Sequence, residues 1–289
     1  MDRMTVSGFH RRIPYLVAER EGLFAREGIE VEFHGVTYSP DHSGEMAAGK
    51  WDLSLSSADK MISLNTLKGM DYVIVLQAEE GLSATLVGRP GMTGVGDLKG
   101  KLIASDNGAN LDLIAAKILR DNGIGEDGYR SMSIGNSKER LGVFLKGGVD
   151  GAILASPWLE QALNAGAVRL ADAADTVPQW PLVCGWGKRR WIADHRPLVT
   201  RFIRALADAA DWALDGANRD AAIKLLMEVQ KVNLERARRA YALIVPKVRV
   251  NPAAIQTVIE LRAEMGAYPP PHEPPERFYD LSYWTEATA

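Results

Sequence analysis

Hydrophobic and polar residues at the start of the chain alternate as they do in a strand, a helix and a second strand. Residues 4–6 have strand character, and Pro14 falls in the first turn of a helix, where its missing N–H is not needed. Residues 15–24 carry apolar side chains at helical spacing, and residues 29–34 alternate apolar with polar side chains. The chain is therefore predicted to open with a βαβ unit.

The same alternation of strands and helices continues along the chain. It predicts further strands over residues 51–55, 72–76, 83–88, 102–104, 132–134, 152–154, 168–170 and 181–186, and helices over residues 59–67, 111–120 and 138–145. Strands that alternate with helices favour a mainly parallel sheet that is covered by helices on both faces. We therefore expect an α/β fold.

Changes in composition divide the chain into two lobes. A glycine-rich stretch follows residue 88, and an apolar segment at residues 181–186 returns the chain to the first lobe. The expected division is residues 1–88 for the first part of lobe 1, residues 89–180 for lobe 2, and residues 181–289 for the return strand, a helical C-terminal extension and a proline-rich tail. We expect that tail to be extended polyproline II that wraps back, with Phe278, Tyr279, Tyr283 and Trp284 as anchors.

Composition excludes several classes of protein. The net charge of −3 and the absence of a basic stripe argue against a general role with nucleic acid or at membrane surfaces. The single cysteine, Cys184, excludes an internal disulfide and a cysteine-based zinc site. The five histidines lack the spacings of a metal site, so we expect no metal and no cofactor.

Candidate binding residues follow from the strand assignments, because ligands of open α/β sheets bind beyond the carboxyl ends of the strands. Serines that cap helices there leave N–H groups that suit an anion, and an imidazole, a guanidinium or an indole adds a donor or a stacking face. Each of these residues can equally have a capping, solvent-facing or core role. The candidate ligand-binding residues are His10, Arg11, Tyr38, His42, Ser56, Ser57, Lys60, Glu79, Ser105, Asn107, Asn110, Ser156, Trp158 and Trp186.

The segment Ile-Pro-Tyr-Leu-Val-Ala-Glu-Arg-Glu-Gly-Leu-Phe-Ala-Arg-Glu-Gly-Ile-Glu-Val-Glu-Phe at residues 13–33 resembles the start of the type II periplasmic solute-binding proteins of ABC importers. Residues 48–53, 97–104 and 145–153 extend the resemblance, in the branch that holds sulfonate, nitrate and taurine binders and the pyrimidine synthases of thiamine biosynthesis. The resemblance implies two lobes that close over a small organic solute, anionic or aromatic, in a cleft between them. It also implies an ABC permease as partner, and we expect a monomer.

An enzyme on the same fold is the alternative that the sequence leaves open. The pyrimidine synthases carry a lysine and a histidine where this chain has Ser56 and Lys60, and only Cys184 lies near their cysteine cluster. The desulfinases of this fold use a cysteine near the start of the chain, and none is present there. The resemblance therefore transfers no catalytic residue, although a decarboxylase or other lyase that acts on a small aromatic or heterocyclic acid through His10, His42 or a glutamate stays open.

The cellular location depends on where the native chain begins. No charged segment with an apolar core precedes the first strand, and no apolar run is long enough to span a bilayer. As written, the sequence predicts a cytoplasmic protein, whereas a chain trimmed to its mature start is expected to be periplasmic.

Overall fold

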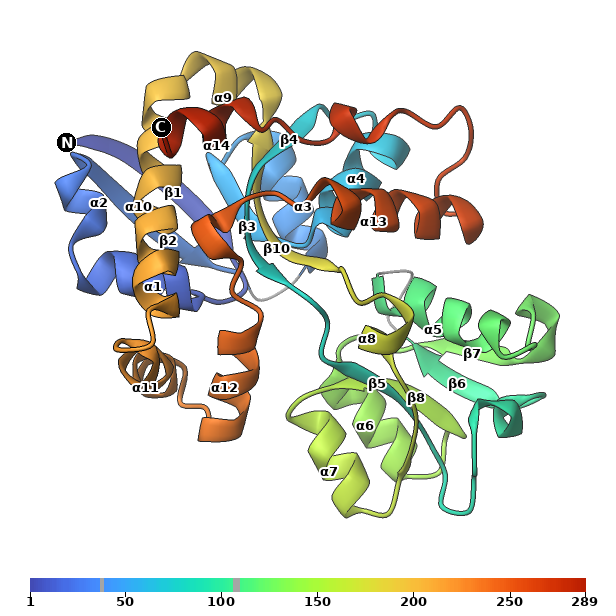
Figure 1. Cartoon of the computed structure of the whole chain (residues 1–289). Coiled ribbons are helices and arrows are strands. Elements are labelled where there is room, and N and C mark those ends of the chain that lie inside the picture. Colours follow the sequence, from blue (N-terminus) through green and yellow to red (C-terminus); the bar gives the residue numbers. More distant parts are fainter. Residues whose placement is uncertain (37–38, 106–109) are drawn as a thin grey trace. The chain divides into compact units, whose positions relative to one another are not determined.

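The computed structural model describes residues 1–36, 39–105 and 110–289, which divide into two compact units (Figure 1). Unit 1 holds residues 1–80, 181–258 and 271–289, and unit 2 holds residues 81–180 and 259–270. The sequence analysis placed residues 81–88 with the first lobe and residues 259–270 with the C-terminal extension. The structure groups both segments with unit 2, where residues 84–88 pair with two other strands.

Unit 1 is built on a sheet of five strands in the order β2-β1-β3-β10-β4. The strands are β1 (Asp2–Gly8), β2 (Ile29–Gly35), β3 (Leu53–Ser56), β4 (Tyr72–Glu80) and β10 (Pro181–Lys188). Strands β1, β2 and β3 are parallel, whereas β10 runs antiparallel to β3 and β4. In this register Val6 lies opposite both Phe33 and Leu53.

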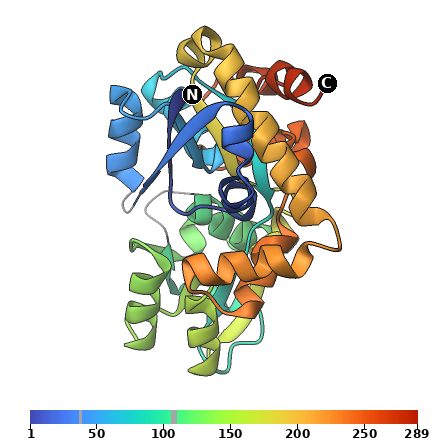
Figure 2. The ribbon, with the colours of Figure 1, turned by 90° about the vertical axis from the view of Figure 1, so that its left-hand side faces the viewer.

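Helices cover unit 1, and the longest is α10 (Arg196–Leu214). The others are α1 (Ile13–Arg20), α2 (Leu23–Arg26), α3 (Ser39–Ala48), α4 (Ala58–Lys68), α9 (Arg189–Asp194), α11 (Arg219–Gln230), α12 (Leu234–Ala242), α14 (Ser282–Ala287) and the first part of α13 (Pro252–Glu264). Within this unit α10 packs on α1, α2 and α14, as two views of the ribbon show (Figures 1 and 2).

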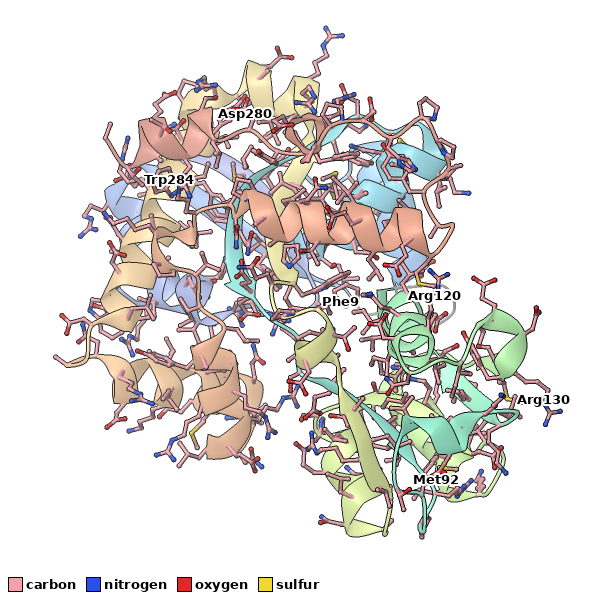
Figure 3. The ribbon with its side chains drawn as sticks, turned by 45° about the vertical axis from the view of Figure 1, so that its right-hand side comes forward. Phe9, Met92, Arg120, Arg130, Asp280 and Trp284 are labelled. Atoms are coloured by element: carbon pink, nitrogen blue, oxygen red, sulfur yellow. The ribbon has the colours of Figure 1, made fainter. Side chains whose placement is uncertain are left out.

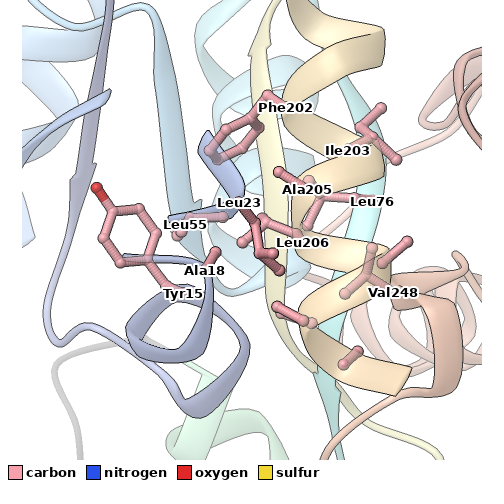
Figure 4. Close-up of a cluster of buried hydrophobic side chains, with 14 of the residues drawn as sticks. Tyr15, Ala18, Leu23, Leu55, Leu76, Phe202, Ile203, Ala205, Leu206 and Val248 are labelled. Carbon is pink, nitrogen blue, oxygen red and sulfur yellow. The ribbon is translucent and has the colours of Figure 1, made fainter. Parts of the chain in front are cut away.

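The core of unit 1 lies between α10 and the N-terminal βαβ unit (Figure 4). Phe202 of α10 stacks on Phe24 at a ring separation of 5.7 Å, and the ring of Tyr15 packs against Phe24 at 5.2 Å. Each fully buried ring or branched aliphatic side chain contributes about 1.5–3 kcal/mol. The apolar positions of the opening segment therefore form the centre of this core.

Unit 2 repeats the same design. Its sheet has the order β7-β6-β8-β5-β9, with β6, β7 and β8 parallel and β5 antiparallel to β8 and β9. The strands are β5 (Ala84–Gly88), β6 (Leu102–Ser105), β7 (Arg130–Ser133), β8 (Gly151–Ala155) and β9 (Val168–Asp172), and the helices are α5 (Asn110–Asp121), α6 (Ser137–Leu145), α7 (Trp158–Asn164) and α8 (Ala173–Thr176). The expected α/β fold with two mainly parallel sheets is confirmed.

The C-terminal tail corrects one expectation. Residues 282–287 form helix α14, so an extended polyproline conformation is wrong for this stretch; the side chain of Asp280 (Figure 3) accepts the N–H of Ser282 at 2.9 Å at the start of the helix. Phe278 and Tyr283 are buried as expected of anchors, and the indole of half-buried Trp284 donates to the carbonyl of Lys247 at 2.9 Å. Within the described ranges no helix is both long and apolar enough to cross a membrane.

Candidate functional site

The carboxyl ends of β1 and β3 place several polar side chains in unit 1. Strand β1 ends at Gly8 and leads into the loop that carries His10, and β3 ends at Ser56, directly before α4. Ser57 caps α4, because its hydroxyl accepts the N–H of Asp59 at 3.2 Å. This capping role leaves less of the Ser57 hydroxyl available to a ligand.

A serine and a histidine meet at the centre of this region. The hydroxyl oxygen of Ser7, on β1, lies 2.8 Å from Nε2 of His42, on α3, and both side chains are fully buried. The Ser7 hydroxyl also reaches the carbonyl of Leu53 at 3.3 Å, while Nδ1 of His42 has no hydrogen-bond partner among the described residues. One ring nitrogen of the imidazole is therefore satisfied, whereas the other is buried without a partner among the described residues.

The electrostatic surroundings keep His42 neutral. Burial, followed by the positive charge of Lys60, lowers the pKa of His42 to about 4, against a smaller opposing effect of Glu45. Burial also lowers the pKa of Lys60 to about 8, and Asp59 opposes that shift. A neutral imidazole beside a cation is suited to hydrogen bonding with a polar or anionic group.

Hydroxyl groups and aromatic rings continue from this pair into the sheet. The indole N–H of Trp186 donates to the Ser56 hydroxyl at 3.1 Å, and Ser56 is 2.8 Å from the Ser54 hydroxyl. The Trp186 ring packs against Tyr72 at 5.0 Å and lies 6.2 Å from His42. Trp186 and Ser56 are both buried, so their hydrogen bond satisfies two groups of the core.

Phe9 connects this buried cluster with the surface. Its ring meets the His42 ring edge-on at 6.2 Å, and the residue is 36% exposed at the end of β1 (Figure 3). The next residues are cationic or titratable. Partial desolvation, and then the charges of Arg12 and Arg236, lower the pKa of His10. An exposed aromatic face therefore lies beside a histidine and two arginines.

The two arginines of this loop have different partners. Arg11 forms an exposed ion pair with Glu19 at 3.1 Å, whereas Arg12 approaches the buried Glu79 on β4 at 3.4 Å. Both carboxylate oxygens of Glu79 are buried without a hydrogen bond from the described residues, and burial raises its pKa, opposed by Arg12. A ligand contact by Arg11 or Glu79 would have to compete with these pairs.

The remaining candidates belong to unit 2. Ser105 ends β6 and its hydroxyl is 2.9 Å from that of Ser131, while the Ser156 hydroxyl donates to Glu160 at 2.6 Å. Trp158 begins α7, and the ammonium group of Lys138 lies 5.9 Å from its ring centre. These residues lie at strand ends, as the sequence analysis expected.

Some candidates lie outside what the structure describes. Tyr38 and Asn107 fall in the two gaps of the described ranges, and Asn110 begins α5 with a side chain that is not described. In the described ranges no three His, Cys, Asp or Glu side chains come together as a metal site would require. Cys184 is fully buried, and burial raises the pKa of its thiol, so it is held in the inert thiol form.

The sequence analysis missed four residues of this region: Ser7, Phe9, Arg12 and Ser54. Ser7 and Ser54 look like ordinary strand residues in the sequence, because nothing local indicates which neighbours a strand side chain meets. Phe9 lies in the loop that the strand assignment singled out, so its aromatic character next to a histidine and two arginines was the available signal.

Residues 10–219 match the model of the family described as NMT1/THI5 like, which covers most of the chain. The protein belongs to this family, and the resemblance to the type II solute-binding proteins of ABC importers is confirmed. A comparison of the sequence with curated proteins gives no match.

Solved structures share the fold over nearly the whole chain. The alkanesulfonate-binding protein SsuA from Xanthomonas axonopodis pv. citri, bound to MOPS, has a TM-score of 0.76 and 18% identity, covering 97% of this chain and 99% of that one. The periplasmic nitrate-binding protein NrtA from Synechocystis has a TM-score of 0.76 and 13% identity, over 100% of this chain and 88% of that one. The desulfurization enzyme DSZB has a TM-score of 0.73 and 15% identity, over 100% and 99%. Identities this low establish the fold only.

Proposed function

We propose that the protein binds a small organic anion as the substrate-binding component of an ABC-type importer. The family and the fold, which it shares with sulfonate- and nitrate-binding proteins, support solute binding. An ABC permease is then the partner, and a periplasmic location follows from that role. The binding surface on unit 1 is the region around Phe9, His10 and His42.

The observation that carries this proposal is the exposed Phe9 ring, which rests edge-on against His42 and precedes His10 and the guanidinium groups of Arg11 and Arg12. An aromatic face favours the flat or apolar body of a ligand, and adjacent guanidinium groups favour its acid group. The positive charges of Lys60 and Arg236 lie near the two histidines and extend the same field. An organic sulfonate or carboxylate meets both requirements.

A thermal-shift and calorimetric screen tests the proposal. Aromatic and aliphatic sulfonates, nitrate, aromatic carboxylates and neutral pyrimidines are compared at matched concentration. We expect organic anions to raise the melting temperature, because a ligand at 100 times its dissociation constant contributes about 2.7 kcal/mol of stability. Stabilisation by the neutral compounds alone, or by none of the panel, would overturn the anion assignment.

A matched pair of variants localises the site. Phe9→Ala is expected to weaken binding of the best aromatic anion by about 2- to 12-fold, which corresponds to about 0.5–1.5 kcal/mol for a lost ring contact. Leu67→Ala removes another exposed apolar side chain of unit 1, on α4, and should leave binding unchanged. Equal effects of the two substitutions would show that the ring at Phe9 is not part of the site.

A second candidate function is catalysis, and the contact between Ser7 and His42 is the observation that favours it. A hydroxyl 2.8 Å from a neutral imidazole has the geometry of a nucleophile and its base. Both side chains are fully buried, so a substrate must first displace the residues above them. Mass spectrometry of the stabilising ligand decides between the two functions. Recovery of the ligand unchanged supports binding. Consumption of the ligand by the original protein, but not by the Ser7→Ala variant, supports an enzyme.

A further inference from the structure

A pocket of about 420 Å³ opens in unit 1 away from the region just described. It lies against the edge of β4 and is formed by residues 242–246 and 249–251 together with Glu80. Its volume is in the range of small-molecule sites, and its walls are mostly apolar with a few polar groups. The polar side chains on its lining are those of Glu80, Arg249 and Asn251.

Two amide side chains fix the carboxylate of Glu80. Its Oε2 accepts one hydrogen bond from Nε2 of Gln77 at 2.7 Å and another from Nδ2 of Asn251 at 2.9 Å. Gln77 is itself fully buried, and its Oε1 accepts the backbone N–H of Asn251 at 3.0 Å. The carboxylate is therefore held in one orientation by neutral donors.

The negative charge of Glu80 has no cationic partner among the described residues, and its Oε1 accepts no hydrogen bond from them. This differs from its neighbour Glu79, which Arg12 approaches at 3.4 Å. A half-buried carboxylate with one oxygen fixed and one oxygen open is arranged to accept hydrogen bonds from a bound cation.

The backbone of the pocket wall is strained and firmly attached. The N–H of Glu80 donates to the carbonyl of Leu243 at 2.9 Å, and the N–H of Val245 donates to the carbonyl of Ala78 at 3.1 Å. Lys247 and Val248 then adopt left-handed conformations with φ of 52° and 48°, which is rare for a β-branched residue. This turn carries the chain back to Arg249 and Asn251, and such strain is concentrated at functional sites.

Arg249 supplies the opposite charge on the lining. Its guanidinium centre lies 5.2 Å from the centre of the Trp284 ring, a contact that restricts the side chain. The apolar residues Ala242, Leu243, Ile244, Val245, Pro246 and Val250 complete the lining. The pocket thus offers a carboxylate, a guanidinium and an apolar surface to one small molecule.

We propose that this pocket is a second ligand site that takes an α-amino acid with an apolar side chain. The ammonium group donates to Oε1 of Glu80, the carboxylate meets the Arg249 guanidinium, and the side chain lies on the apolar wall. The inference does not depend on the solute proposed above, because none of the residues of this pocket belongs to the Phe9 and His42 region.

Three probes of one shape test the charge requirements by isothermal titration calorimetry. Leucine carries both charged groups, isopentylamine carries the ammonium alone, and 4-methylpentanoate carries the carboxylate alone. We expect leucine to bind at least tenfold more tightly than isopentylamine, and 4-methylpentanoate not to bind. Binding of the acid as tight as that of leucine, or no binding of leucine at millimolar concentration, overturns the proposal.

Variants assign the contacts. Glu80→Gln keeps an oxygen that accepts from the two amides but removes the charge, so it should weaken the binding of leucine and of isopentylamine at least tenfold. The control Glu286→Gln, on α14, should leave the binding of both compounds unchanged. Arg249→Met should weaken the binding of leucine but not that of isopentylamine. Its matched control is Arg219→Met, since Arg219 also lies over a ring, that of Tyr241, at 5.5 Å, but outside the pocket.

NMR shifts locate the bound probe. Leucine is expected to shift the backbone amides of residues 80, 242–245 and 247–251, and the Phe9 and His42 amides should stay unchanged. Shifts confined to the Phe9 region, or binding that Glu80→Gln leaves intact, would assign leucine to another site and overturn this inference. Circular dichroism of each variant confirms that a loss of binding is not a loss of folding.

Discussion

The guanidinium of Arg12 lies 3.4 Å from the carboxylate of Glu79, and this pair ties the loop after β1 to strand β4. The two partners differ in environment, because the Arg12 side chain is 26% exposed whereas that of Glu79 is 1% exposed. Water can therefore solvate the Arg12 guanidinium, whereas ionised Glu79 is buried and, among the described residues, has only Arg12 as an ion-pair partner.

Replacement of Glu79 by glutamine should stabilise the protein increasingly as the pH rises. Burial raises the pKa of Glu79, so this residue contributes stability below the pKa of an unfolded glutamate, and the contribution is lost as the pH rises through the folded-state pKa. Glu79→Gln removes this loss, which is about 1.4 kcal/mol for each unit by which the pKa is raised. Urea unfolding of both proteins between pH 5 and 8 measures the difference.

The control for this prediction is Glu286→Gln, which alters an exposed carboxylate paired with Arg196 at 2.7 Å. It should change the free energy of unfolding little and without the same pH dependence. A Glu79→Gln protein that is less stable than the original at pH 8 would show that the attraction of Arg12 exceeds the burial penalty.

His42 should make the protein sensitive to acid. Burial, and then Lys60, lowers its pKa to about 4, so its contribution to stability is present above the unfolded-state pKa of about 6.5 and is lost as the pH falls toward 4. The difference of about 2.5 units corresponds to about 3 kcal/mol. The His42→Gln variant should therefore lose about 3 kcal/mol less stability than the original protein between pH 7 and pH 4. Urea unfolding at the two pH values measures this difference.

His195 provides the comparison for His42. It is exposed, and its ring stacks on Trp191 at 4.3 Å. His195→Gln should retain the acid sensitivity of the unsubstituted protein. An NMR titration in which the His42 ring becomes protonated near pH 6.5 would contradict the predicted effect.

Removal of the Ser56 hydroxyl should destabilise unit 1. Ser56→Ala leaves the buried Trp186 indole N–H without its acceptor and removes the partner of the Ser54 hydroxyl. An unsatisfied buried donor costs about 1–3 kcal/mol. Thermal unfolding should show this loss, whereas Ser133→Ala, at an exposed position on β7, should stay within about 0.5 kcal/mol.

The buried Arg140 should be essential to unit 2. Its guanidinium donates to the Ile153 carbonyl at 2.9 Å, to the Ser137 hydroxyl at 2.9 Å and to the Ser105 carbonyl at 3.3 Å. Arg140→Met removes these donors, and we expect a loss of about 2–4 kcal/mol in urea unfolding. The control Arg130→Met replaces an exposed arginine of β7 (Figure 3) and should change the free energy of unfolding by less than about 0.5 kcal/mol. Equal losses of stability in the two variants would refute a structural role for Arg140.

The sequence predicts the fold well because strand and helix periodicity is local. Residues 29–34 alternate in the sequence and form β2, and Pro14 marks the start of α1 as predicted. The expected polyproline conformation is wrong at residues 282–287, because these residues form helix α14 and Tyr283 is buried in the core of unit 1.

The candidate site was less predictable, because its contacts join distant segments. His42 was selected in the loop expected after the second strand and Trp186 on the expected return strand. Their contacts with Ser7 and Ser56 respectively depend on the order of β1, β3 and β10 in the sheet. The pocket at Glu80 depends on residues more than a hundred positions apart, and periodicity contains no information about such pairs.

The position of β10 between β3 and β4 has a consequence for biosynthesis. Every strand or bridge partner of β4 in the described chain, from β10 to Ile244 and Tyr279, comes later in the sequence. Residues 81–180 are made in between, which takes roughly 5–20 s at about 5–20 residues per second. During that interval a strand whose first five residues, 72–76, are all apolar lacks the partners it has in the fold, which leaves this run exposed to aggregation until β10 is made.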